Sequence, residues 1–162
     1  MEIEVYGNRL KLVDNEIYCY RKIKPNSKKM DWCKITFTLC NGYLTCLLSN
    51  NKIQRKFSYH RLIYYFYNPE WDILNTELVI DHINRDKLDN SIENLRSGTQ
   101  QENNWNRGAK GCYFHKQTGK WVAQIAINKK NIYLGLHNTE EEDHEVYLQA
   151  KKKYHIIIQN IV

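Results

Sequence analysis

The 162-residue sequence lacks the patterns that mark membrane, secreted and zinc-binding proteins. Its five cysteines are odd in number, and no two of them stand at a C-x-x-C or similar ligand spacing. We therefore expect no zinc site, and instead buried free thiols in a reducing compartment. No apolar run approaches the roughly 18 residues of a membrane span, and the start MEIEVYGNRL does not have the pattern of a signal peptide. These absences predict an intracellular protein with no targeting signal and no membrane partner.

Charge is unevenly distributed along the chain. The 24 basic and 18 acidic residues give a formal charge of +6. Residues 1–76 hold 12 basic and 7 acidic side chains, residues 77–107 hold 4 and 6, and residues 108–162 hold 8 and 5. An acidic middle between basic flanks suits carboxylates that hold a cation between phosphate-binding arms. A basic surface that serves only solubility is the alternative that charge alone leaves open.

Alternating patterning and turn residues predict a β-rich region over residues 1–58. Two hairpins are expected, with turns at Asp14-Asn15 and Asn41-Gly42. Residues 22–31 are polar and basic, which predicts a loop between the hairpins.

Residues 59–107 predict a compact unit of strand, loop, strand and short helix. Ser58 is placed to cap a helix over residues 59–67, which comes before the first of these strands. A brief apolar strand at residues 78–80 then carries Asp81-His82 at its end. Residues 108–162 are expected to form a three-stranded sheet and a helix. The predicted fold class is therefore α+β, in three parts: residues 1–58, 59–107 and 108–162.

Four side chains in the acidic middle have the types that a phosphodiesterase uses: Asp81, His82, Asn94 and Asn103. Carboxylate and amide oxygens are hard ligands, and two of them suit one Mg²⁺ that keeps several waters. A neutral His82 beside them can deprotonate a water molecule at neutral pH. Metal and base together supply what phosphodiester hydrolysis needs. An Asp-His pair by itself is nevertheless more often structural than catalytic.

Residues 108–137 contain five lysines and no acidic residue. In the expected central strand one set of side chains alternates toward the helix: Trp121, Ala123, Ile125 and Ile127. The other set faces outward: Val122, Gln124, Ala126 and Asn128. Such an outer face could enter a DNA major groove. A small sheet with a solvated face and no partner is the alternative.

The stretch VIDHINRDKLDNSIENLRSGTQQENNWNR, residues 79–107, resembles the HNH motif of phage-type homing endonucleases. DHIN, a polar loop, DN-x-x-ENLR and T-x-x-x-N-N match in order and spacing. The resemblance implies a ββα-metal nuclease fold that cuts double-stranded DNA with one Mg²⁺ or Mn²⁺. It implies Asp81 and Asn103 as metal ligands and His82 as general base. Asn94 would be the central catalytic asparagine, which braces the loop between the two strands.

Two further positions follow from the same resemblance. His60, in YHRLIYYFYN, matches a helix that commonly precedes the motif, where it either contacts phosphate or packs. Arg85 stands where the family usually has glycine, and a positive φ there would be mildly strained. The resemblance also implies that a phage, a large virus or a mobile element encodes the protein.

The stretch GCYFHKQTGKWVAQIAINKKNIYLGLHNTEEE resembles the AP2 DNA-binding domain. Its markers are G-x-Y-x-x-x-x-x-G-K-W-x-A-x-I, I-Y-L-G and T-x-E-E. Such domains read DNA with the outer face of their sheet, which implies the DNA-binding residues Tyr113, His115, Lys116, Lys120, Gln124, Lys130, Asn131 and Tyr133. Asp143 departs from the pattern, because the family mostly has alanine at that position of the helix.

The sequence therefore predicts a metal-dependent endonuclease of double-stranded DNA. We expect a monomer with no small-molecule substrate. The alternative is a non-enzymatic, AP2-like DNA-binding regulator with a decayed nuclease site. The presence of all four motif residues favours the enzyme.

Overall fold

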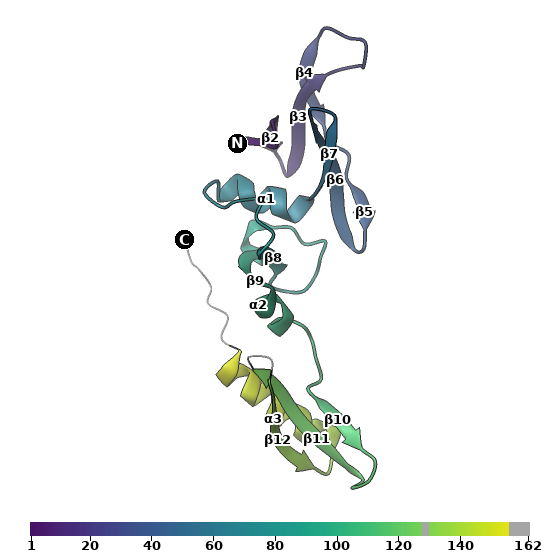
Figure 1. Cartoon of the computed structure of the whole chain (residues 1–162), viewed down its shortest axis with the longest axis vertical. Helices are drawn as coiled ribbons and strands as arrows, with labels where there is room; N and C mark the ends of the chain where they lie inside the picture. The colour runs from purple at the N-terminus through teal and green to yellow at the C-terminus, as the bar shows by residue number, and fades with distance from the viewer. Residues whose placement is uncertain (128–129, 156–162) are drawn as a thin grey trace. The chain divides into compact units, whose positions relative to one another are not determined.

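The computed structural model describes residues 1–127 and 130–155, and the chain divides into two compact units, Met1–Gln100 and Gln101–Val162. The fold is α+β with several small antiparallel sheets (Figure 1). The division falls near Gln100, and the three-part division at residues 58 and 107 stays a prediction. The outward position expected for Asn128 lies outside the described residues. No helix in the described ranges is long and apolar enough to cross a membrane.

The first sheet of unit 1 has four antiparallel strands in chain order: β1 (Glu2–Val5), β2 (Asn8–Val13), β3 (Glu16–Lys22) and β4 (Met30–Lys34). The turn at Asp14-Asn15 is confirmed, with φ of 47° and 58° at the two residues. The loop expected over residues 22–31 is shorter, because Met30–Lys34 pairs with β3. Its strand state comes from that pairing, which local patterning did not reveal.

The second sheet contains β5 (Thr38–Cys40), β6 (Tyr43–Asn50) and β7 (Ile53–Ser58), and the Asn41-Gly42 turn between β5 and β6 is confirmed. Helix α1 (Tyr59–Tyr67) follows directly, as predicted. Ser58 occupies the N-cap position, but its side chain makes no capping hydrogen bond. The expected cap is therefore wrong in its chemistry although right in its place.

One hydrophobic core spans the two sheets, α1 and the strands that follow. It includes Leu10 and Ile17 of the first sheet, Phe57 of β7 and Leu62 of α1. Since strand residue Ile80 belongs to the same core, the segment that carries Asp81-His82 is supported by the N-terminal sheets.

All five cysteines are free thiols, but only Cys19 and Cys46 are buried. The other three are half-buried, so the expectation of buried thiols is correct for two of the five. Burial raises the pKa of Cys46 to about 11, which keeps this thiol protonated and unreactive at neutral pH.

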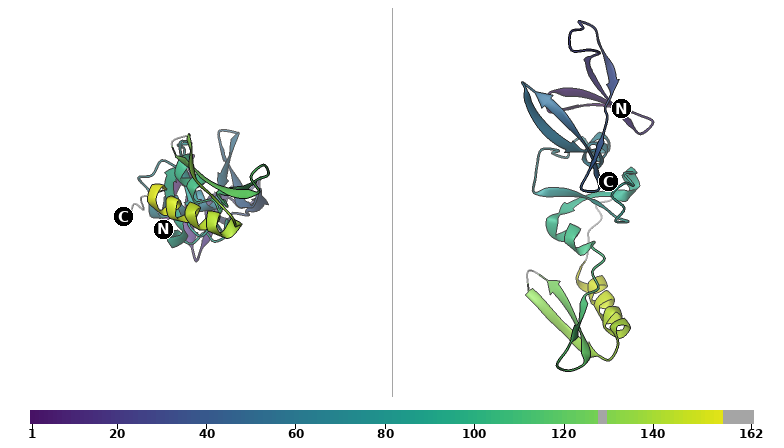
Figure 2. Two further views of the ribbon diagram at one scale, coloured as in Figure 1. Left: turned by 90° about the horizontal axis from the view of Figure 1, so that it is seen from below. Right: turned by 90° about the vertical axis from the view of Figure 1, so that its right-hand side faces the viewer.

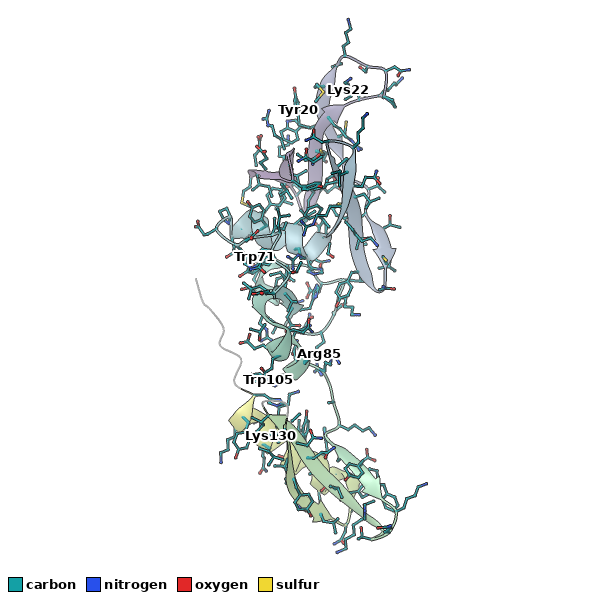
Figure 3. The ribbon with its side chains drawn as sticks, in the orientation of Figure 1. Tyr20, Lys22, Trp71, Arg85, Trp105 and Lys130 are labelled. Carbon is teal, nitrogen blue, oxygen red and sulfur yellow. The ribbon has the colours of Figure 1, made fainter. Side chains whose placement is uncertain are left out.

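Arg61 of α1 fastens the loop that leads to the motif. Its guanidinium donates to the carbonyl oxygens of Ile73 (2.8 Å), Asn75 (2.9 Å) and Leu78 (3.2 Å). The same group lies 4.6 Å from the ring centroid of Trp71, which Figure 3 labels. Because Leu78 begins the next strand, these bonds fix where that strand starts.

Unit 2 contains most of α2 (Gln100–Trp105), a three-stranded sheet and a helix. The sheet is β10 (Cys112–His115), β11 (Lys120–Ile127) and β12 (Lys130–His137), and α3 (Glu140–Tyr154) lies along it (Figure 2). Ala123 and Ile125 are buried as expected. Val122, expected outward, is also buried, because Tyr113 and Leu136 stand beside it on the neighbouring strands.

A hydrogen bond between a histidine and a buried carboxylate joins α3 to the sheet. Asp143 is fully buried and its Oδ1 bonds Nδ1 of His137. Gly135 leaves room for this pair, since a Cβ added there would lie 2.8 Å from the His137 ring. The pair supplies the physical reason for an acidic residue at a helix position where the AP2 resemblance has alanine.

Candidate active site

The motif residues lie on a two-stranded antiparallel sheet in unit 1. Strand β8 (Leu78–His82) pairs with β9 (Leu95–Thr99), which follows the short helix η1 (Ile92–Asn94). Asp81 and His82 are only 9% and 4% exposed at the end of β8. The prediction that an apolar strand ends on this pair is confirmed, and the strand includes both residues.

Asp81 is held by a residue that sequence reasoning did not single out. Arg96 lies directly opposite it in the β8–β9 register. The Arg96 Nη2 and Nε atoms donate to Asp81 Oδ2 at 2.7 and 3.2 Å. Because both bonds use Oδ2, the carboxylate orientation is fixed while Oδ1 remains as the oxygen that Arg96 does not engage.

His82 is oriented by Asn90. The side chain Oδ1 of Asn90 lies 3.1 Å from His82 Nε2, and Asn90 Nδ2 donates to the carbonyl of Leu88 at 2.9 Å. The second bond assigns the amide, so the oxygen faces His82 and Nε2 carries the hydrogen. In the neutral ring the lone pair is then on Nδ1.

Asn94 spans the loop between the strands. Its Oδ1 accepts from the backbone N–H of Asn84 at 2.9 Å, and its Nδ2 donates to the carbonyl of Asp89 at 2.7 Å. These are the bonds that a bracing asparagine would make. Arg85 has φ of 69°, so the positive φ anticipated from the resemblance is present.

His60 is buried beneath the His82 ring. It is 7% exposed, and its ring centroid lies 5.0 Å from that of His82 and 5.2 Å from that of Tyr43. Burial, with a smaller contribution from His82, lowers the pKa of His60 to about 3. A neutral, buried ring is suited to packing, and the structure favours this alternative over contact with phosphate.

The Asp81 carboxylate is a hard oxygen donor of the kind that a divalent ion such as Mg²⁺ prefers. Among residues 1–127 and 130–155, no three His, Cys, Asp or Glu side chains gather as a metal cage. One carboxylate oxygen and an amide oxygen suit an ion that keeps most of its water, as Mg²⁺ does. Asn103, the predicted amide ligand, lies half-buried on α2 in the other unit, and its pairing with Asp81 stays a prediction.

Six of the eight predicted DNA-binding residues of unit 2 share one face of its sheet, and Lys130, which pairs with Ile127, alternates to the other face. Cross-strand pairs place His115 beside Lys120, Gln124 beside Tyr133 and Asn131 beside Ala126. Tyr133 is 64% exposed and Tyr113 is 46% exposed. Lys116 lies in the β10–β11 turn, and Lys130 is exposed at the start of β12. Tyr113, Gln124 and Asn131 also line a hollow of about 620 Å³.

Three residues of the site escaped sequence reasoning, for different reasons. The contact of Arg96 with Asp81 could have been predicted from the strand register, because β8 and β9 form one antiparallel pair. Asn90 belongs to the Asp89-Asn90 pair of the motif, but only the loop conformation turns its side chain toward His82. Tyr43 comes from the second sheet, and no local signal connects it with the motif.

A buried Asp-His pair at a strand end, beside a loop braced by an asparagine, is the kind of site that a metal-dependent nuclease needs. Residues 58–105 match the family model described as HNH endonuclease. Neither the curated proteins nor the solved structures gave a match. The chain therefore contains an HNH endonuclease domain, the domain of a phosphodiester hydrolase that acts on DNA. The match ends at residue 105, and the AP2 resemblance beyond it stays a prediction.

Proposed function

We propose that the protein is a homing-type endonuclease that hydrolyses phosphodiester bonds of double-stranded DNA with Mg²⁺ or Mn²⁺. The observation that carries the proposal is the HNH match, because it covers the segment that folds into the buried Asp81-His82 site. We further propose that the C-terminal sheet, by its AP2 resemblance, adds affinity and site preference.

His82 is the general base of the proposed reaction. Its Nδ1 removes a proton from a water molecule as the water oxygen attacks phosphorus, and the bond from phosphorus to the 3′ oxygen breaks. The Nε2–H group of the imidazolium that forms still donates to Oδ1 of Asn90, and this hydrogen bond strengthens as positive charge develops on the ring. The packed rings of His60 and Tyr43 keep the imidazole in place.

Asp81 and Asn103 are the proposed ligands of the divalent ion. When bound, the ion would supply charge stabilisation at the phosphate and the leaving oxygen. Arg96 holds the Asp81 carboxylate in one orientation through Oδ2. Asn94 fixes the conformation of the loop between β8 and β9 through its bonds to Asn84 and Asp89.

A plasmid cleavage assay tests the proposal. Supercoiled DNA is incubated with the wild-type protein and Mg²⁺, Mn²⁺ or EDTA, and relaxed and linear products are counted. Cleavage should need the metal and should fall by about 10²–10⁴ in His82→Ala, the usual contribution of a general base.

The matched control is His144→Ala, since His144 lies on α3 and outside the nuclease domain. It should cleave as the wild type does. Equal loss in both variants would indicate general damage, and salt-sensitive DNA binding without any cleavage would favour the non-enzymatic regulator.

A further inference from the structure

The outward face of the first sheet carries cations and aromatic rings in cross-strand rows. Lys11, Tyr18 and Lys34 stand side by side on β2, β3 and β4. Tyr20 and Trp32 form the next row. We define the basic-aromatic face as these residues together with two more cations: Arg9, Lys11, Tyr18, Tyr20, Lys22, Trp32 and Lys34.

The rings and cations of this face are in direct contact. The Arg9 guanidinium lies 5.0 Å from the Tyr20 ring centroid, and the Lys11 ammonium lies 4.8 Å from that of Trp32. The Tyr20 and Trp32 centroids are 5.4 Å apart. Side chains that alternate with these, such as Leu10 and Ile17, fill the core on the other side of the sheet.

The face is accessible within its own unit. Arg9, Tyr20, Lys22 and Lys34 are all exposed, and Figure 3 labels Tyr20 and Lys22 on the sheet. Tyr20 is 36% exposed, although an aromatic ring in a sheet would ordinarily gain by being covered. A sheet face that keeps rings exposed between cations is suited to a partner with both charge and flat surfaces.

The loop from β3 to β4 adds three lysines at the end of the face: Lys24, Lys28 and Lys29. It is an ordered loop, closed by the bond from Ile23 N–H to the Lys29 carbonyl (3.2 Å) and by the bond from Ser27 N–H to the Lys24 carbonyl (3.0 Å). These bonds fix the loop backbone next to Lys22 and leave the three lysine side chains exposed.

The balance of charge on this surface is positive. Seven basic side chains on the face and loop stand against three acidic ones, Glu2, Glu4 and Glu16. Glu2 pairs with Arg9 at 3.4 Å, and Glu16 pairs with Lys34. These three acidic residues lie away from the loop. Asp31, which follows the loop, alternates to the other face of the sheet opposite Arg21, so the excess of positive charge on this face is at the end formed by Lys22 and the loop lysines.

We propose that the basic-aromatic face and the 23–29 loop bind duplex DNA outside the cleavage site, with the loop lysines on phosphates and Tyr20 and Trp32 on sugar and base edges. The inference rests on the proposed function, because that function makes DNA the substrate of this chain. It assigns a DNA contact to named residues of the N-terminal sheet, whereas the sequence alone showed only that residues 1–76 are basic and predicted DNA-binding residues in the range 113–133.

Fluorescence anisotropy with a labelled duplex measures this binding in a His82→Ala background, from 50 to 200 mM KCl. The double substitution Lys28→Gln and Lys29→Gln should lower the slope of log K against log salt by about two, since each phosphate contact contributes about 0.9. The control pair, Lys52→Gln and Lys56→Gln, lies on the β6–β7 hairpin and should leave the slope unchanged.

Tyr20→Ala should weaken binding about tenfold with little change of slope, because a stacking contact releases no counterion. Tyr67→Ala is the matched control, since this tyrosine is 46% exposed at the end of α1. Hydrogen exchange of the protein with only His82 changed gives a readout that needs no surface substitution. DNA should protect the backbone amides of residues 20–32.

Wild-type slope and affinity in the lysine and Tyr20 variants, or no protection of residues 20–32, would overturn the proposed surface. Metal-dependent plasmid cleavage by the wild type would still support the nuclease in that case. Conversely, a slope change without any cleavage would support the surface and reject the proposed function.

Discussion

The hydrogen bond from His82 to Asn90 provides a quantitative test of the proposed base. Replacing Asn90 with alanine removes the acceptor 3.1 Å from Nε2 and leaves the His82 ring present. A hydrogen bond between neutral groups contributes about 0.5–1.5 kcal/mol and one to a charged group about 1.5–3 kcal/mol, so the bond gains about 1–1.5 kcal/mol as His82 takes the proton. Only this gain affects kcat, and at about 1.4 kcal/mol for each factor of ten kcat should fall roughly 5- to 12-fold.

Single-turnover cleavage with saturating enzyme measures this loss, and DNA affinity should stay within about twofold of the wild type. Asn90→Asp keeps an acceptor oxygen at the same place and should recover part of the rate. Asn138→Ala, an exposed asparagine in unit 2, is the control. A wild-type rate in a folded Asn90→Ala protein would refute the argument, because the bond would then not act in the transition state.

Three further predictions concern stability. Asn94→Ala leaves a loop N–H and a loop carbonyl without their bonds, and urea unfolding should show a loss of about 2–4 kcal/mol. His137→Ala leaves the buried Asp143 carboxylate unpaired and should cost about 3–5 kcal/mol in unit 2, whereas adding Asp143→Ala should restore much of it; equal losses in the single and double variants would contradict the pairing. Because the pKa of His60 is about 3 when folded and near 6.5 when unfolded, the unfolded chain binds a proton first as pH falls. Stability should therefore drop by about 2 kcal/mol between pH 7.5 and pH 5. His60→Phe should remove this part of the pH dependence, and an unchanged profile would reject the burial of a neutral imidazole.

Much of the site was predictable because its bonds are local. The positions of Asp81 and His82 at a strand end follow from the apolar run before them. Asn94 reaches the loop ten residues before it, within one strand-loop-strand unit. The turn at Asn41-Gly42 follows from the tolerance of those residues for positive φ.

The sequence by itself determined where the motif, its turns and its short strands lie, since each depends on neighbours a few residues away. Only the tertiary structure decided that Tyr43 and His60 pack on His82, because these contacts join segments 22 to 39 residues apart in a shared core. It also decided that β4 pairs with β3 and that Asp143 turns inward to His137. Patterning assigns a face to each residue, but which surface that face meets is set by how the elements pack together.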